Sequence, residues 1–226
     1  MFLDNQMANN FDLFFSRVLR DEGTAYEDVP GDNGGPTRCG LTIADIARWN
    51  GVKCPKRGQA GWDDLVEKVR AITPQTAAPI YKRFYWDEVR ADELPSGLDY
   101  AVVDYGTNSG TLKAVKTLGG LVGVQGNKVT DEMITAIGRY GSIVDLVTHF
   151  QDSRRAYLEQ ISEIPHNMKF RKGWLDRERR VRAVAKNLAE KAQEASASVV
   201  QVTPPKAVDP SDIPSPPAPS KVTTAA

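Results

Sequence analysis

The sequence predicts a mainly α fold with one small glycine-rich β-hairpin and a disordered C-terminal tail. Apolar residues recur at the three- and four-residue spacing of amphipathic helices through most of residues 11–195. The alternation typical of strands is nearly absent outside a glycine-rich turn at residues 31–36. Residues 203–226 contain seven prolines and no aromatic side chain. Such a segment buries too little apolar surface to offset the entropy of ordering it.

The first helix is predicted by one apolar stripe near the N-terminus. Its members follow the i, i+3, i+4, i+7, i+8 pattern, and they are Phe11, Phe14, Phe15, Val18 and Leu19. We expect Asn10 to cap the helix start and Gly23 to end it. Glu22 then stands in the last turn, next to a loop. The run GDNGGP at residues 31–36 predicts a tight turn or a small hairpin after that loop.

Capping signals predict the helices that follow. Thr42 and Asp45 resemble a capping box, and Thr73 with Pro74 forms a cap and first-turn pair. The dipeptide Leu94-Pro95 is expected to break the helix that starts after Thr73. Further helices are predicted over residues 62–72, 97–107, 112–122, 130–138, 142–164 and 177–195.

The charge of the chain is balanced in total and polarised along its length. Its 226 residues carry 29 Lys and Arg against 29 Asp and Glu. This balance excludes a protein whose whole surface binds nucleic acid or an anionic membrane, because both need an excess of cations. Residues 1–100 hold 12 basic and 16 acidic side chains, whereas residues 166–226 hold 11 and 6. The basic stretch at residues 169–186 is, by default, a solvated helix face.

The cysteine count and the N-terminal residues exclude further classes of protein. Cys39 and Cys54 are too few for a disulfide scaffold or an all-cysteine zinc site, and their spacing from His149 and His166 matches no short metal motif. We therefore expect unpaired thiols and no metal. No apolar run approaches the ~18 residues that span a bilayer. Residues 1–10 lack the features of a secretory signal, so we expect a soluble product made in a cytoplasm.

Two carboxyl groups stand near each other, one at a predicted helix end and one on the glycine-rich turn. Glycoside hydrolysis needs such a pair: one acid protonates the leaving oxygen, and a second carboxylate activates water or attacks the anomeric carbon. Glu22 is the candidate acid because desolvation beside an apolar helix favours a protonated carboxyl. Asp32 is expected to stay ionised, and Thr37 to help hold a water. The same residues also fit a solvated helix-end acid, a turn aspartate and a strand threonine.

This stretch resembles the signature of glycoside hydrolase family 108, the phage and bacterial N-acetylmuramidases. In that signature a helix ends in Glu-Gly-Gly-Tyr and is followed by Asp-x-Gly-Gly-x-Thr-x-Tyr-Gly-Ile-Thr. The matching residues are Glu22, Gly23, Tyr26, Asp32, Gly34, Gly35, Thr37, Gly40 and Thr42. The departures are Thr24 with an extra residue before Tyr26, Cys39 in place of tyrosine, and Leu41 in place of isoleucine.

The resemblance continues downstream in the same order. Residues 80–87 (IYKRFYWD) are similar to the Tyr-x-x-x-Tyr-Trp-Asp segment of the family. Residues 104–110 (DYGTNSG) and 172–177 (KGWLDR) resemble the opening and closing motifs of the predicted peptidoglycan-binding region associated with it. The resemblance thus covers residues ~8 to ~190, and chance rarely supplies several ordered motifs together. It implies a lysozyme-like helical catalytic region at 8–92, a peptidoglycan-binding-like region at 93–195 packed on it, and a tail at 196–226.

The resemblance also implies roles for the site residues. By analogy with phage lysozymes, which invert at the anomeric centre, Glu22 is the general acid, Asp32 positions or deprotonates water, and Thr37 assists. The candidate substrate contacts are Tyr26, Asn108 and Trp86. At their helical spacing Trp86 and the tyrosines before it equally fit the core. Asp104, one turn before Asn108, is expected to be structural, and no metal or organic cofactor is needed.

The implied activity is hydrolysis of the β-1,4 bond between N-acetylmuramic acid and N-acetylglucosamine in peptidoglycan. The expected setting is a phage endolysin, monomeric, held in the host cytoplasm until a holin or another route lets it reach the periplasmic wall. A bacterial cell-wall hydrolase tied to secretion is the alternative origin. The basic stretch at 169–186 would contact the anionic wall or outer membrane, and no nucleic acid is expected as partner. The rival functions are a non-catalytic peptidoglycan-binding or virion structural protein, and a lytic transglycosylase.

Overall fold

The fold is mainly helical with one small antiparallel sheet, as the sequence predicts. The computed structural model describes residues 10–29 and 35–200. The strands pair in the order β1-β2-β3 and are β1 (Tyr26–Glu27), β2 (Thr37–Arg38) and β3 (Leu41–Thr42). The α-helices in this part of the chain are α1 (Asn10–Glu22), α2 (Ile43–Trp49), α3 (Trp62–Arg70), α4 (Pro74–Tyr81), α5 (Leu98–Ser109), α6 (Thr111–Val122), α7 (Asp131–Gly138), α8 (Ile143–Ser162) and α9 (Arg171–Val200).

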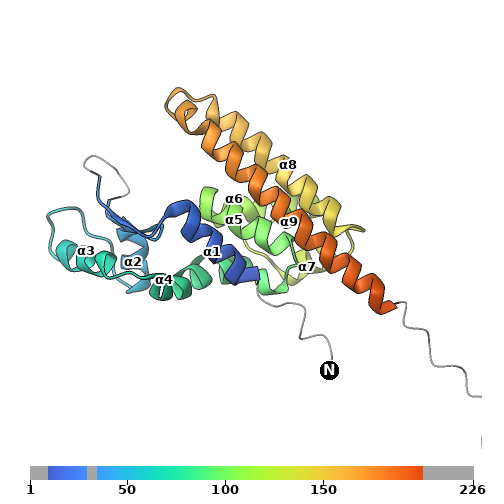
Figure 1. Ribbon diagram of the computed structural model, residues 1–226, viewed down its shortest axis with the longest axis horizontal. Coiled ribbons are helices and arrows are strands. Elements are labelled where there is room, and N and C mark those ends of the chain that lie inside the picture. Colours follow the sequence, from blue (N-terminus) through green and yellow to red (C-terminus); the bar gives the residue numbers. More distant parts are fainter. Residues whose placement is uncertain (1–9, 30–34, 201–226) are drawn as a thin grey trace, which may run out of the picture.

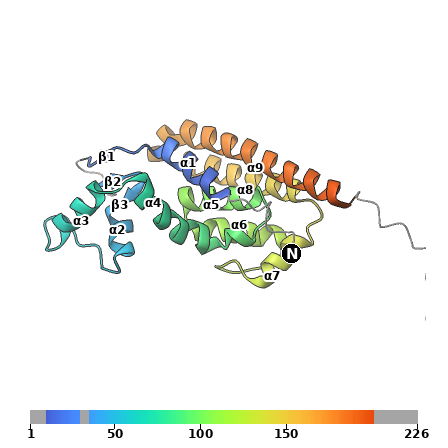
Figure 2. The same cartoon turned by 60° about the horizontal axis from the view of Figure 1, so that its bottom comes forward.

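The molecule is elongated (Figure 1). The sheet, α2 and α3 form one end, whereas α8 and α9 lie side by side as a long antiparallel hairpin (Figures 1 and 2). Helix α5 packs against α1, α6, α8 and α9. One hydrophobic core runs from Phe14 through Tyr100 to Val181, so it continues across the boundary expected at residue 92. None of the helices within residues 10–29 and 35–200 is long and apolar enough to span a membrane.

The predicted caps of α2 and α4 are confirmed. Thr42 accepts from the backbone of Asp45 and the Asp45 carboxylate accepts from the Thr42 backbone N–H at 2.9 Å. Thr73 caps α4 in the same reciprocal way with Thr76. Asn10 does not act as the expected cap. Its Nδ2 donates to Ser96 Oγ at 3.0 Å and to an Asp99 carboxylate oxygen at 2.7 Å, and so ties α1 to the start of α5.

The chain after α4 departs from the continuous helix expected up to Leu94. Helix α4 ends at Tyr81, and a π-helical turn (Lys82–Trp86) and two 3-10 turns (Asp87–Val89 and Ala91–Glu93) follow it. The wider π turn changes the helical register and directs Trp86 into the core. Its indole is 2% exposed, stands edge-on to Phe11, and donates to the Asp92 carboxylate at 2.6 Å.

Helix α9 is longer at both ends than the predicted span of 177–195. A 3-10 turn (Pro165–Phe170) links it to α8. Residues 196–200 of the expected tail thus belong to α9, and residues 201–226 lie outside the described part of the chain. Close packing fixes α9 against the start of α5. Gly97 has φ of +90°, and a Cβ there would lie 2.8 Å from the backbone nitrogen of Ala189.

The Gly97→Ala substitution is expected to lower the free energy of unfolding by about 2 kcal/mol, because the added methyl group meets the α9 backbone. Gly120→Ala is the matched control: Gly120 lies inside α6 with no atom within 4 Å of an added Cβ. That control should raise the free energy of unfolding by about 0.5–1 kcal/mol. Urea unfolding of both variants measures the difference, and equal effects would contradict the close α5–α9 packing.

Asp99 should make stability depend on pH in the acidic range. Burial raises its pKa to about 6, although Asn10 and two backbone N–H groups donate to it. A raised folded-state pKa stabilises the fold below the unfolded-state pKa near 4, and this contribution is lost as pH rises through about 6. Asp99→Asn should remove this part, on the order of 3 kcal/mol, from the difference between the pH 4 and pH 7 unfolding free energies. Denaturant unfolding at both pH values tests this; an unchanged difference would contradict it.

Candidate active site

Glu22 lies at the end of α1, where the sequence places it. The helix stops because Gly23 takes φ of +75° and its N–H donates to the Leu19 carbonyl at 3.0 Å. The Glu22 side chain is 41% exposed and bonds Arg177 Nη1 through Oε1 at 2.8 Å. Glu22 is therefore more exposed than the desolvated acid expected from the sequence. Its position depends on an ion pair and on the turn packed against it.

That turn joins β2 to β3 and packs closely against Glu22. Gly40 has φ of +73°, and a Cβ there would lie 2.9 Å from Glu22 Cγ. The Tyr81 hydroxyl donates to the Cys39 carbonyl at 3.1 Å and so fixes the turn against α4. Cys39 stands where the resemblance expects tyrosine; its side chain is buried, and burial raises the pKa of its thiol. A residue with a side chain at position 40 would push Glu22 away.

Arg177 reaches the site from α9, more than 150 positions along the chain. Besides Glu22, its guanidinium bonds the Asp104 carboxylate, with Nη2 at 3.1 Å and Nε at 3.3 Å. The Arg177 side chain is 11% exposed. Burial lowers the pKa of Arg177, but the carboxylates of Asp104 and Glu22 outweigh burial and raise it. Arg177 therefore stays charged and holds two carboxylates at once.

Asp104 is the buried member of this arrangement. One of its oxygens accepts from Arg154 Nη2 at 2.8 Å, and both Asp104 and Arg154 are inaccessible or nearly so. Burial alone would raise the pKa of Asp104, but the guanidinium groups of Arg154 and Arg177 hold it below its ordinary value. The structural role expected for Asp104 is thus supported. Its partners are two arginines, not Asn108.

Four charged groups therefore form one continuous series, Arg154–Asp104–Arg177–Glu22. The charges alternate in sign and sum to zero, and the series runs from the α5–α8 core to the exposed end of α1. We refer to these four residues as the ion-pair network. The buried Asp104 carboxylate holds Arg177 in place, and Arg177 in turn orients the Glu22 side chain.

The other predicted catalytic residues lie on the glycine-rich side. Thr37 is in β2, opposite Glu27 and Thr42, and half-buried. No hydrogen bond within residues 10–29 and 35–200 joins it to Glu22. Asp32 lies outside the described residues. Thr37 thus belongs to the same sheet as the β2–β3 turn that packs on Glu22.

The three predicted substrate contacts have different environments. Tyr26 is a half-buried residue of β1, and the Arg70 guanidinium lies 4.8 Å from its ring centroid. Asn108 is half-buried at the end of α5, and the hydroxyl of the preceding Thr107 lies 3.5 Å from Arg177 Nη2. Trp86 is in the core and offers no ring face to a sugar. Of the three predicted contacts, Asn108 is thus the one that adjoins a residue in contact with Arg177.

Tyr85 is a neighbour of the site that the sequence patterns did not distinguish from the core. It is half-buried and its ring lies 5.4 Å from that of Tyr81. Burial, together with the Asp45 and Glu22 carboxylates, raises the pKa of Tyr85 to about 12. Tyr85 is therefore a neutral hydroxyl beside Tyr81, whose own hydroxyl bonds the turn that packs on Glu22.

Arg177 is a residue of the candidate site that sequence reasoning missed. The basic stretch at 169–186 was expected to be a solvated face or a wall contact. The signal that could have drawn attention to Arg177 is its place as the last residue of the KGWLDR motif. Several other arginines of the stretch also bond carboxylates within the fold. The pairs are Arg179–Asp176, Arg180–Asp21 at 3.5 Å and Arg182–Asp152 at 2.6 Å.

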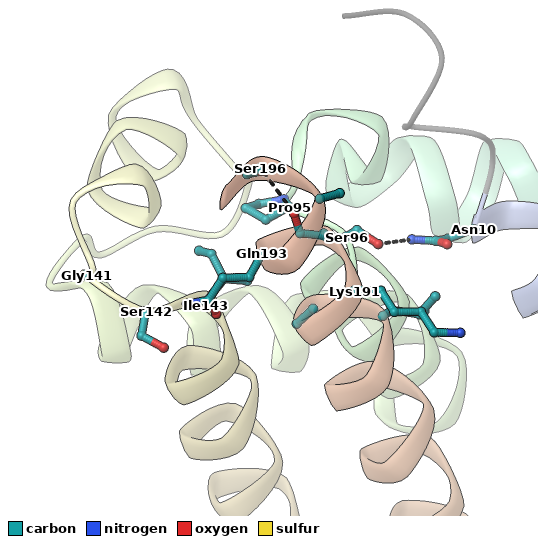
Figure 3. Close-up of a pocket in the computed structure, with 13 residues that line it drawn as sticks. Asn10, Pro95, Ser96, Gly141, Ser142, Ile143, Lys191, Gln193 and Ser196 are labelled. Atoms are coloured by element: carbon teal, nitrogen blue, oxygen red, sulfur yellow. Dashed lines mark hydrogen bonds between the residues drawn. The ribbon is translucent and has the colours of Figure 1, made fainter. Parts of the chain in front are cut away.

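A cavity of about 790 Å³ lies at the other end of α9 (Figure 3). Pro95, Ser96, Ile143 and Gln193 are among its lining residues, and the Asn10–Ser96 hydrogen bond crosses its edge. Along α9, Gln193 is about 24 Å from Arg177 at 1.5 Å per residue. The cavity is therefore separate from the site around Glu22.

Two comparisons with known proteins find matches to this chain. The family model of glycosyl hydrolase 108 matches residues 15–110. The solved structure of Brucella abortus SagA is 33% identical to this chain, with a TM-score of 0.67. The match covers 80% of this chain and 95% of the SagA chain. No curated protein sequence matches. Glu22 and Asp104 lie inside the range of the family model, whereas Arg154 and Arg177 lie beyond it.

The Asp104→Asn substitution is expected to destabilise the fold by about 3–5 kcal/mol, because it leaves two buried guanidinium groups without their shared anion. Asp152→Asn is the matched control. It removes a surface ion pair between α8 and α9, the two helices that carry the arginine partners of Asp104. That change should cost less than about 1 kcal/mol. Denaturant unfolding measures the free energy of unfolding of both variants. A similar loss in both would contradict a larger contribution from the ion-pair network than from a surface ion pair.

Proposed function

Because this chain belongs to the glycosyl hydrolase 108 family, we propose that it is an N-acetylmuramidase that cleaves peptidoglycan. The bond hydrolysed is the β-1,4 bond between N-acetylmuramic acid and N-acetylglucosamine. The observation that carries the proposal is the exposed Glu22 carboxyl, held by Arg177 and packed on the Gly40 turn. A carboxyl with a fixed orientation and one accessible side suits an acid that must meet a glycosidic oxygen.

In the proposed reaction Glu22 protonates the leaving oxygen. Arg177 donates to Oε1, and no described residue bonds Oε2, which is left to carry the proton. As the glycosidic bond breaks, water attacks the anomeric carbon and gives a proton to Asp32, with Thr37 helping to position that water. Inversion at the anomeric centre is the expected outcome by analogy with phage lysozymes. Tyr26 and Asn108 are the proposed substrate contacts.

The proposed setting is lysis of a bacterial host by a phage endolysin. The protein acts as a monomer, stays in the host cytoplasm until a holin or an equivalent route releases it, and then hydrolyses the periplasmic wall. A bacterial hydrolase tied to secretion fits the same chemistry and would act on the same polymer.

Mass spectrometry of muropeptides from digested sacculi tests the activity. The wild type should release products with reducing N-acetylmuramic acid ends. Glu22→Gln should lower the rate at least about 100-fold, since it removes the proton donor but keeps the side-chain shape. Asp32→Asn should cause a similar loss. Asp21→Asn, a change in the neighbouring carboxylate that pairs with Arg20 and Arg180, is the control and should keep most activity.

Other products would identify the rival functions. Ends of the 1,6-anhydro type, with Asp32→Asn still active, would identify a lytic transglycosylase. Binding to sacculi without release of sugar, unaffected by Glu22→Gln, would identify a non-catalytic peptidoglycan-binding or virion structural protein. Thermal unfolding of each variant checks that a lost activity is not a lost fold.

A further inference from the structure

The turn between α8 and α9 exposes an unusual concentration of apolar side chains. Ile164 is 44% exposed, Met168 63% and Phe170 46%. These three belong to the seven large hydrophobic residues that are exposed in the described part of the chain, and they lie within seven positions. Exposed apolar residues that gather in this way mark interaction surfaces. We call residues 164–172 the hairpin tip.

The hairpin tip is also strongly basic. Its nine residues include Lys169, Arg171 and Lys172 and no Asp or Glu. Lys169 has no carboxylate partner among the described residues, and Arg171 bonds only the Ser162 hydroxyl at 3.1 Å. Lys172 pairs with Asp176 but its side chain is almost fully exposed. The tip therefore keeps positive charge available, unlike Arg180 and Arg182, which bond Asp21 of α1 and Asp152 of α8.

The hairpin tip stands clear of the remaining helices. Helix α8 has 20 residues and is about 30 Å long. The turn at its end lies at the top of Figure 1, above α1 and the sheet. An extended planar surface can therefore meet the tip without colliding with the body of the molecule.

The arrangement of the rings favours lipid over sugar as the partner. Phe170 stacks on Trp174 with centroids 5.6 Å apart, and the Lys169 ammonium lies 4.8 Å from the Phe170 centroid. A sugar that stacks on an aromatic residue needs a free ring face, and here the ring is already engaged. The exposed apolar residues beside these cations are Ile164, Met168 and Phe170 itself. These suit the boundary between lipid headgroups and acyl chains, with cations beside them for lipid phosphates.

We propose that the hairpin tip binds the surface of an anionic phospholipid membrane. Met168, Phe170 and Ile164 enter the headgroup region, and the three cations contact lipid phosphates. Arg171 and Arg177 are six residues apart on α9, about 9 Å. Membrane binding would thus hold Glu22 near the bilayer. This inference is independent of the proposed hydrolytic activity, because it concerns only the affinity of the tip for lipid.

Flotation of the full chain with vesicles tests the proposal. The chain should float with vesicles of phosphatidylcholine mixed with phosphatidylglycerol, and much less with pure phosphatidylcholine. Met168→Ser combined with Phe170→Ser should weaken this binding about tenfold or more, as should Lys169→Gln, Arg171→Gln and Lys172→Gln together. Met168→Ser alone, at the most exposed position, should weaken it less and is the variant least able to disturb folding.

Two controls match these changes elsewhere on the surface. Leu112→Ser removes a similarly exposed apolar side chain (48%) from α6. The triple variant Lys116→Gln, Lys128→Gln and Arg139→Gln removes three exposed cations and so the same net charge. Both controls should bind vesicles as the wild type does, and the tip variants should still digest purified sacculi.

Three results would overturn the proposal. The first is absence of binding to the anionic vesicles, and the second is equal loss in the controls and the tip variants. The third is unchanged vesicle binding with weakened binding to purified sacculi, which would make the wall polymer the partner of the tip.

Discussion

The buried carboxylate of Asp104 is the group on which the rest of the structure depends. Burial of a single ionised carboxylate in a protein core costs several kcal/mol unless cations and hydrogen bonds compensate. Here Arg154 from α8 and Arg177 from α9 both supply that compensation. Helix α5 thus fixes how the α8–α9 hairpin lies on the core. The guanidinium that satisfies Asp104 also orients Glu22 at the surface, so core stability and the geometry of the site share one residue.

Much of the fold is predictable because its helix boundaries carry local signals. The pairs Thr42–Asp45 and Thr73–Thr76 act through side-chain bonds within four residues, and Gly23 ends α1 through its own backbone conformation. The errors occur where packing overrides such signals. Asn10 has the side chain of a cap and bonds α5 instead. Trp86 continues an apolar periodicity, but the π turn before it changes which way its ring points. Periodicity assumes a constant rotation per residue and cannot register that change.

The site is predictable only in its local part. Glu22 follows from a helix end and a glycine-rich turn, which are both neighbours in sequence. Arg177 does not, since an ion pair between residues so far apart is set by the fold and leaves no spacing to recognise. The uneven charge along the chain has the same explanation. Basic residues near the end pair with acids near the beginning, as Arg177 does with Glu22 and Arg180 with Asp21. Opposite charges that are far apart in the sequence thus form ion pairs in the folded protein.

The close contact of Gly97 with α9 has a consequence for modularity. Gly97 meets α9 at Ala185 and Ala189, well past the range of the family model, which ends at residue 110. A fragment cut at that limit would expose this contact surface and leave the Asp104 carboxylate without either arginine. The smallest unit that can be moved intact into a chimeric protein therefore includes α9 through Ala189. A fusion partner should therefore be attached after Ala189, beyond the part of α9 that contacts Gly97 and that carries the arginine partner of Glu22.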